Sequence, residues 1–76
     1  MSNLTTTEIL VFATHVINID QMNDVLIRLL MHPGVKQANF DLEDIDKVLR
    51  VVSKGITAEE VEKILLKQRI FCKALV

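Results

Sequence analysis

The stretch from residue 8 to residue 22 constrains the fold of this chain most, because an extended apolar pattern changes there into a helical one. Residues 8–17, EILVFATHVI, are rich in β-branched and aromatic side chains and contain no Gly or Pro, which predicts a β-strand. Asn18, followed three residues later by Gln21, resembles a capping box and marks the start of a helix. The junction therefore leaves free backbone N–H groups at a helix N-terminus, where small folds often bind ligands.

Two amphipathic helices are predicted. After Asn18, apolar residues recur at spacings of three and four and form one inward stripe: Ile19, Met22, Val25, Leu26, Leu29 and Leu30. Pro33-Gly34 ends this helix. Thr57 and Glu60 form a second capping box, followed by an inward stripe of Val61, Ile64, Leu65 and Gln68, and the helix ends at Arg69.

Three further strands are predicted from β-rich runs. Residues 35–42 alternate with period two and place Ala38, Phe40 and Leu42 on one side, although Lys36 interrupts this set. A short acidic turn at residues 43–46 leads into a strand at residues 47–53, so residues 35–53 are expected to form a hairpin. Residues 70–76 give the last strand.

The order strand, helix, strand, strand, helix, strand predicts one α+β domain over residues 1–76, with residues 1–7 as a polar lead-in. Two right-handed crossovers around a central hairpin give a ferredoxin-like βαββαβ fold, in which a four-stranded antiparallel sheet of order 4-1-3-2 carries both helices on one face. In this order the end of the first strand lies beside the start of the last, so His15 is expected near residues 70–72.

Composition and charge exclude several classes of function. Half of the residues are apolar, yet no apolar run approaches the ~20 residues that cross a bilayer, so we expect no membrane contact. The net charge of −1, with both signs interspersed, gives no reason to expect nucleic acid as a partner. No secretory signal is visible, and the single cysteine, Cys72, fits a reducing compartment, so we expect a cytoplasmic protein.

Three segments carry a resemblance to a known family. They are His32-Pro33-Gly34-Val35 at the end of the first helix, Asn39-Phe40-Asp41-Leu42 in one strand and Val48-Leu49-Arg50-Val51 in the next. With the spacing of all the elements, they resemble the heavy-metal-associated domain of copper chaperones and metal-pumping ATPases. The resemblance covers nearly the whole chain and implies the same fold.

The resemblance also implies a Cys-x-x-Cys pair at the first junction, where such domains bind soft metals. The comparable positions here are Asn18 and Gln21, or Ile19 and Met22 in a register shifted by one residue, and neither pair contains a thiol. Thiolates select soft ions such as Cu(I), and amide or aliphatic side chains do not replace them. We therefore expect a member of this fold whose metal-binding motif is absent.

Other residues offer weaker candidates for chemistry. His15, Met22 and Cys72 are expected near one end of the sheet, so binding or delivery of a soft metal through a non-standard site is our alternative hypothesis. A lone Cys, a Met in an apolar stripe and a His at a strand end are more often structural, so we assign no metal or other cofactor. Binding of a small molecule to the free N–H groups of residues 19–21 is a third option.

An enzymatic function is not expected. The loop from Thr14 to Met22 contains neither the Gly nor the Arg of a phosphate cradle, and Cys72 has no recognisable base and orienting group. The acidic turn lacks the Gly and the closing Glu of a calcium loop.

The leading hypothesis is a non-enzymatic protein-interaction module. Once both helices cover one face of the sheet, the opposite parity of the strands exposes an apolar strip, which monomers seldom leave uncovered. Its expected members are Ile9, Val11, Ala13, Val48 and Val52, with Cys72 beside them. We expect this open face or an edge strand to dock a second copy, giving a homodimer, or a partner protein. A β-bulge would reverse the parity and change these residues.

Overall fold

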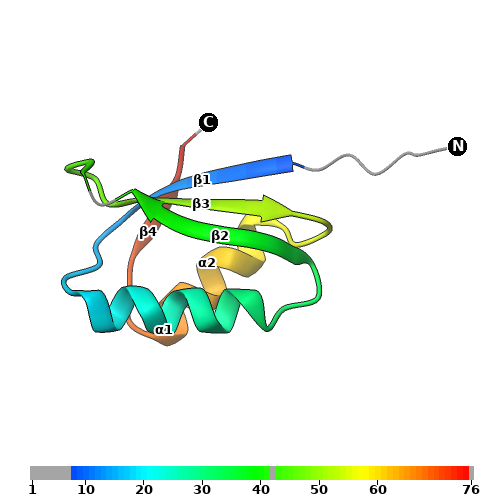
Figure 1. Ribbon diagram of the computed structural model, residues 1–76, viewed down its shortest axis with the longest axis horizontal. Helices are drawn as coiled ribbons and strands as arrows, with labels where there is room; N and C mark the ends of the chain where they lie inside the picture. The colour runs from blue at the N-terminus through cyan, green and yellow to red at the C-terminus, as the bar shows by residue number, and fades with distance from the viewer. Residues whose placement is uncertain (1–7, 42, 76) are drawn as a thin grey trace, which may run out of the picture.

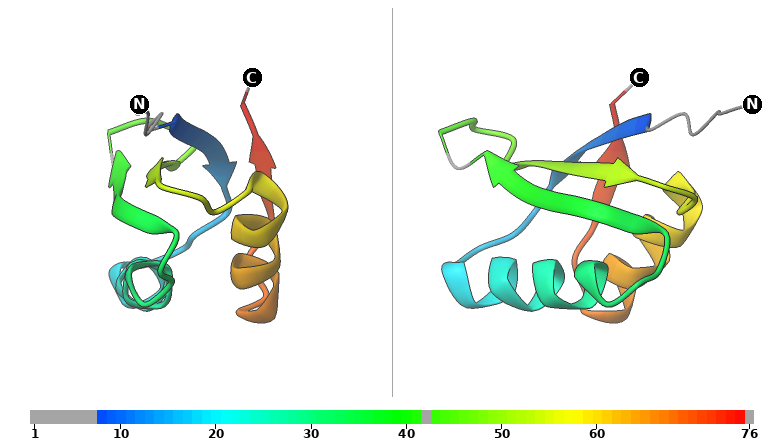
Figure 2. Two further views of the ribbon diagram at one scale, coloured as in Figure 1. Left: turned by 90° about the vertical axis from the view of Figure 1, so that its right-hand side faces the viewer. Right: turned by 45° about the vertical axis from the view of Figure 1, so that its right-hand side comes forward.

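The computed structural model describes residues 8–41 and 43–75. Its elements are β1 (Glu8–Thr14), α1 (Ile19–Leu30), β2 (Val35–Asp41), β3 (Val48–Ser53), α2 (Ala58–Lys67) and β4 (Cys72–Ala74). The strands form an antiparallel sheet in the order β2-β3-β1-β4, and both helices lie on the same face of it (Figures 1 and 2). This is the predicted order 4-1-3-2 counted from the other edge, so the predicted ferredoxin-like fold is confirmed.

The strand register decides which side chains form the core. Phe12 on β1 lies opposite Leu49 on β3 and Ala74 on β4, and Leu10 lies opposite Val51, so these residues share the helix side of the sheet. The largest fully buried side chains come from this side and from the two helices: Phe12, Leu29, Leu49, Leu65, Val25, Val51 and Val61. Full burial of such a side chain contributes roughly 1.5–3 kcal/mol, so this cluster dominates the stability of the domain.

Helix α1 begins and ends as predicted, but its buried stripe is narrower than predicted. Met22, Val25 and Leu29 are buried, whereas Ile19 is 64% exposed and Leu30 is 53% exposed. The prediction that these two residues face the core is wrong. The sheet ends at β2 above α1, so only the side of the helix that faces inward is covered (Figure 2).

The two helix N-termini are capped in different ways. In α1, Asn18 Oδ1 accepts a hydrogen bond from Gln21 N–H at 2.9 Å, but Gln21 Oε1 accepts from Ile17 N–H at 2.7 Å rather than from Asn18. The reciprocal bond is displaced by one residue, so the expected capping box is incomplete there. In α2 the box is complete: Thr57 N–H donates to Glu60 Oε1 at 3.1 Å, and Glu60 N–H donates to Thr57 Oγ1 at 3.2 Å.

Helix α2 ends at Lys67, and Arg69, the residue predicted to end it, is the left-handed residue just beyond the C-cap Gln68. Arg69 has φ 61°, its N–H donates to Leu66 O at 2.8 Å, and Ile70 N–H donates to Leu65 O at 3.0 Å. This pair of bonds is a Schellman motif, which turns the chain and places the buried Ile70 in the core. The last strand is only three residues long, not the predicted seven, because the Schellman motif extends to Ile70 and regular pairing with β1 begins only at Cys72. Val76 lies outside the described residues.

A β-bulge at Lys36 explains the interruption in the second strand pattern. Val35 lies opposite Ser53 while Gln37 lies opposite Val52, so β2 contains one extra residue at this point. The bulge puts Val35 on the helix side together with Ala38 and leaves Lys36 exposed. Leu42, the last residue of the predicted strand, lies outside the described residues.

Candidate functional site

The junction between β1 and α1 uses its polar side chains for helix structure. Asn18 and Gln21 both bond backbone N–H groups at the start of α1, as described above. Gln21 N–H and Met22 N–H are themselves bonded to Asn18, so the expected free N–H groups of residues 19–21 are partly engaged. In the alternative register the two positions hold the exposed Ile19 and the buried Met22. Neither register presents a pair of donors for a soft metal.

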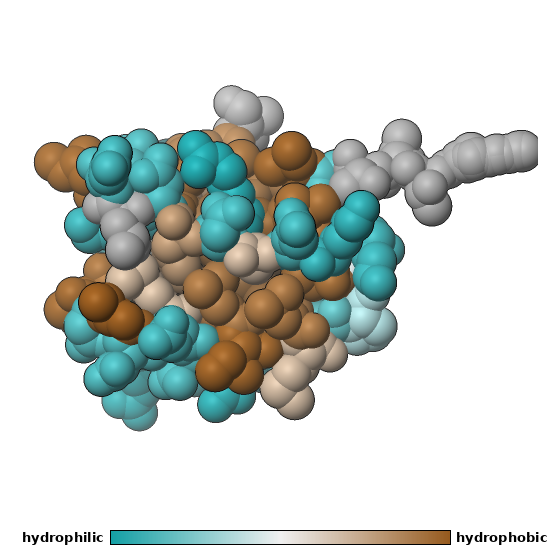
Figure 3. Space-filling view, in the orientation of Figure 1, coloured by the Kyte–Doolittle hydropathy of each residue, from teal (hydrophilic) through white to brown (hydrophobic). Residues whose placement is uncertain are grey.

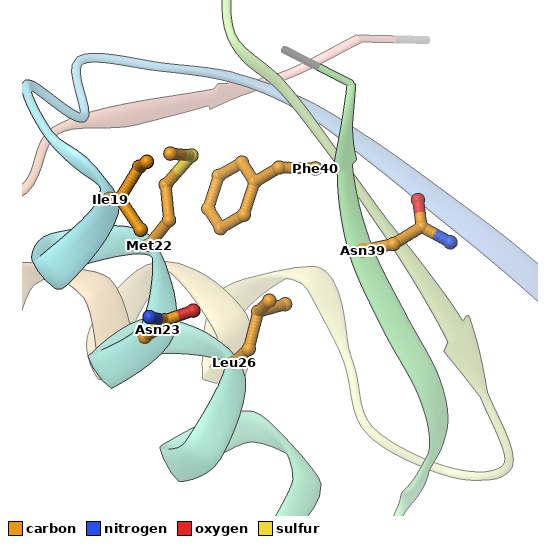
Figure 4. A pocket seen from close by; sticks show the side chains of 6 residues that line it. All are labelled: Ile19, Met22, Asn23, Leu26, Asn39 and Phe40. Carbon is orange, nitrogen blue, oxygen red and sulfur yellow. The ribbon is translucent and has the colours of Figure 1, made fainter.

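The three candidate metal ligands do not converge. The expected proximity of His15 to the last strand is confirmed, because His15 N–H donates to Phe71 O at 3.1 Å, and His15 and Cys72 line one shallow pocket. Met22 instead lines a separate groove between α1 and β2 (Figure 4). Across residues 8–41 and 43–75, no three His, Cys, Asp or Glu side chains lie together in a way that could hold a metal ion.

The thiol of Cys72 has low reactivity in this environment. It lies opposite Thr14 in the register, on the helix side of the sheet, and packs against the core, so the expectation that it borders the open face is wrong. Burial raises the pKa of its thiol from the ordinary 9.0 to about 11, and the nearby Glu62 carboxylate adds to the rise. Because the thiolate is both the metal ligand and the nucleophile, Cys72 is poorly suited to either role at neutral pH.

The face of the sheet opposite the helices carries four of the five predicted interaction residues at its surface. Ile9 is 63% exposed and lies opposite the half-buried Val52, and Val11 and Ala13 are also half-buried. Val48 is only 5% exposed, so the prediction that it lies in the exposed strip is wrong.

The turn before β3 is tied to the end of β1. Thr14 N–H donates to Asp46 O at 3.0 Å and Thr14 Oγ1 donates to Lys47 O at 2.7 Å. Val48, which directly follows this turn, is buried but does not belong to the main core cluster.

Two exposed apolar residues of this face were missed in the sequence. Phe71 is 66% exposed and Leu75 is 44% exposed, and Leu75 N–H donates to Val11 O at 2.8 Å. Both have the parity opposite to that of Cys72 and Ala74, so the alternation around the last strand could have identified them. We define the sheet-face strip as Ile9, Val11, Ala13, Val52, Phe71 and Leu75.

A second apolar surface lies at the edge of the sheet. A groove of about 280 Å³ runs between α1 and β2 and is lined by Ile19, Met22, Asn23, Leu26, Asn39 and Phe40. In Figure 4 the ring of Phe40 points toward Met22 and Ile19, while the side chain of Asn39 points away. We call this the edge groove. It was not predicted, because α1 was expected to bury its whole stripe.

Together, the βαββαβ order, the sheet order and the two helices on one face define a ferredoxin-like domain. Among solved structures the chain is similar to the yeast copper transporter domain Ccc2A, determined in solution in apo and Cu(I)-loaded states, with 18% identity and a TM-score of 0.81. The match covers 93% of this chain and 97% of that chain. At this identity the likeness shows the fold alone, and it confirms the predicted resemblance at that level.

Comparisons by sequence add nothing to this assignment. No family model matches the chain, and no curated protein matches it. Neither of the helices within residues 8–41 and 43–75 has the length and apolarity that a membrane span requires.

Proposed function

We propose that the chain is a non-enzymatic interaction module that contacts a partner protein through the sheet-face strip. One observation supports this most: apolar side chains of the central strand β1 stay accessible on the face opposite the helices, continuous with Phe71 and Leu75 at the β4 side. A large aromatic side chain such as Phe71 commonly supplies much of the binding energy at the centre of an interface.

The charges beside the strip suggest the kind of partner that fits. Arg50 lies opposite Val11 in the register, and Lys73 lies opposite Ala13; both side chains are exposed. Arg50 is 3.7 Å from Asp41, which neutralises part of its charge, while Lys73 stands at the β4 side of the strip. A partner with an apolar patch bordered by carboxylates would complement this face and associate faster at low salt.

The absence of enzymatic activity is part of this proposal. Its support is that the candidate reactive groups are engaged or inert: Asn18 and Gln21 cap α1, and Cys72 holds its proton at neutral pH. A catalytic acid or base would need a pKa near the working pH, and a nucleophile would need a lowered pKa or a base within hydrogen-bond distance.

Site-specific photocrosslinking in cells that produce the protein tests the proposal. A benzoylphenylalanine at Phe71 should give a covalent adduct of defined mass, because this side chain lies within the strip. The matched control is the same group at Ile45, an apolar residue that is 90% exposed but lies in the β2–β3 turn. The cross-linked partner is then purified, and its affinity for each variant is compared with its affinity for the wild-type chain. The affinity should be at least about tenfold lower for Phe71→Ser and unchanged for Ile45→Ser. No adduct at position 71, or the same adduct at both positions, would refute the proposal.

The alternative function, soft-metal binding through His15, Met22 and Cys72, rests on the likeness to a copper transporter domain. The geometry gives it little support, because Met22 lies in the edge groove and the other two in a different pocket. Anaerobic titration with Cu(I) separates the two functions. An affinity that falls in both Cys72→Ser and His15→Ala would favour the metal site, whereas an unchanged affinity would eliminate it.

A further inference from the structure

The edge of the sheet at β2 is open. β2 is the outermost strand and pairs only with β3 among the described residues, so the other side of its backbone is free to pair with a further strand. Natural sheets usually protect such an edge with charges, and here residues 37–40 carry none. The segment from Gln37 to Phe40 is therefore an uncharged pairing site between the bulge at Lys36 and the charge of Asp41.

Helix α1 extends its apolar surface beyond this edge. Ile19, Leu26 and Leu30 follow one another at spacings of seven and four residues and form a second stripe beside the buried one. Ile19 and Leu30 are mostly exposed, and Leu26 is partly buried. In Figure 3, which looks onto β2 and α1, apolar surface fills the space between the two elements. A strand added beside β2 would extend the sheet over the edge groove and over this stripe.

The edge strand itself carries opposite charges at its two ends. Lys36 is exposed at the start of β2, and Asp41 is half-buried at its end. A second copy rotated by a two-fold axis would bring Lys36 of each copy near Asp41 of the other, whereas a copy in the same orientation would oppose like charges. Arg28 takes no part in this arrangement, because it lies on the side of α1 that faces α2, where it lines a pocket with Ile64 and Lys67.

We propose that two copies of the chain pair antiparallel through β2 and form one continuous eight-stranded sheet with all four helices on one face. A two-fold axis perpendicular to the sheet keeps paired residues on the same face, and a register centred on Asn39 sets Ala38 of one copy opposite Phe40 of the other. The Ala38 and Phe40 side chains of both copies then cover the two edge grooves. This interface uses neither Phe71 nor Val11, so it is independent of the sheet-face strip.

Sedimentation equilibrium of the purified full chain, with two variants, tests this pairing. The wild-type chain should be a dimer, and Asn39→Asp should raise the dimer dissociation constant about tenfold or more, because the new carboxylates of the two copies would face each other across the axis. The monomer tolerates this change, since Asn39 lies opposite Arg50 in its own sheet and a carboxylate there gains a favourable neighbour. Asn39→Thr, a neutral strand former, should leave the dimer intact.

A cross-link reports the register. Asn39→Cys in a Cys72→Ser background should form a disulfide-linked dimer under mild oxidation, because directly paired Cβ atoms approach to about 4.5–5.5 Å. Lys63→Cys in the same background places the thiol on the exposed side of α2 and should form no disulfide-linked dimer. Absence of the specific disulfide at position 39 would reject this register.

The outcomes separate this inference from the proposed function. A monomer at several hundred micromolar wild-type chain overturns the β2 dimer and leaves the crosslinking test at Phe71 unaffected. A dimer that survives Asn39→Asp but is lost in Phe71→Ser would place self-association on the sheet-face strip and overturn the β2 pairing as well.

Discussion

Arg69 holds a backbone conformation that suits glycine better than arginine. Its φ of 61° lies in the left-handed region, which costs a non-glycine residue roughly 1–2 kcal/mol. We expect Arg69→Gly to raise the free energy of unfolding by about 0.5–1 kcal/mol, since the greater freedom of glycine in the unfolded chain offsets part of the gain. Urea denaturation measures this. Arg69→Ala, which removes the side chain but keeps the strain, should show no such gain, and a less stable Arg69→Gly chain would contradict the argument.

Gly34 leaves no room for a side chain. A Cβ atom there would lie 2.6 Å from the backbone nitrogen of Ile56. The backbone cannot retreat easily, because Gly34 O accepts hydrogen bonds from Lys54 N–H at 2.8 Å and Ile56 N–H at 3.2 Å. We expect Gly34→Ala to lower the free energy of unfolding by roughly 1–3 kcal/mol, the range for overpacked sites. Lys54→Ala, at the exposed neighbour, should change it little; equal stability of the two variants would refute the clash.

Cys72 should react slowly with thiol reagents. With a pKa of about 11 against an ordinary 9.0, the thiolate population at pH 8 is about 100-fold smaller than for a normal cysteine. The greater nucleophilicity of a more basic thiolate recovers about tenfold of this, so the rate should still be about tenfold lower than normal. Ellman's reagent, applied to the folded chain and to the chain in urea, measures the ratio. Equal rates would show that the thiol is neither buried nor shifted.

At the scale of secondary-structure elements, the sequence was sufficient to predict a helix start or end wherever a short pattern of neighbouring residues determines it. The Thr57 capping box, the Pro33-Gly34 stop and the end of α2 near Arg69 were all predicted from short patterns, and the structure contains them. The bulge at Lys36 was visible only as an interruption, because a bulge is decided by pairing with β3 rather than by the residues of β2.

The candidate surfaces depend on more than one element, and this is why they were predicted only in part. The alternation of residues along β1 was enough to predict that Ile9, Val11 and Ala13 lie on the face opposite the helices, because this alternation is a property of a single strand. Val48 is buried directly after a turn that is bonded to Thr14 of another strand, and the exposure of Ile19 and Leu30 depends on where the sheet ends above α1. The periodicity of the sequence around Val48, Ile19 and Leu30 predicts neither this burial nor this exposure.

The N-terminus of α2 should make stability depend on pH. Hydrogen bonds from Thr57, from its backbone first and then from its hydroxyl, lower the pKa of Glu60 below its ordinary 4.5, and His32 adds a smaller effect. A lowered pKa in the folded chain means that the stabilisation is present above pH 4.5 and is lost as the pH falls through the folded value. Glu60→Gln should therefore flatten the decline of the urea midpoint below pH 4.5.

The control for this effect is Glu59→Gln, which removes the same charge one residue earlier in the same turn. This chain should keep the acid-dependent decline of the wild type. If both variants flatten the profile equally, the general charge of the first turn, and not the capping box, would be responsible.

At the scale of the whole molecule, a net charge of −1 coexists with opposite charges at the two ends of the edge strand β2. Because Lys36 of one copy would lie near Asp41 of the other in the proposed dimer, added salt should weaken the dimer. Screening shortens from about 10 Å at 0.1 M to about 3 Å at 1 M salt, so we expect the dissociation constant to rise severalfold over this range. Sedimentation at the two concentrations measures this. A dimer strengthened by salt would indicate purely apolar association and contradict the charge-based orientation.

The short β4 has a consequence for synthesis of the protein. β1 is made before the other strands, yet it pairs on one side with β3 and on the other with residues 72–74, which are made after all the other elements described. Until those residues emerge, the nascent chain holds a seven-residue apolar strand with one unpaired flank. Translation speed and chaperone contact should therefore matter more for its yield than for a helical chain of equal length, in which neighbours along the sequence close the core early.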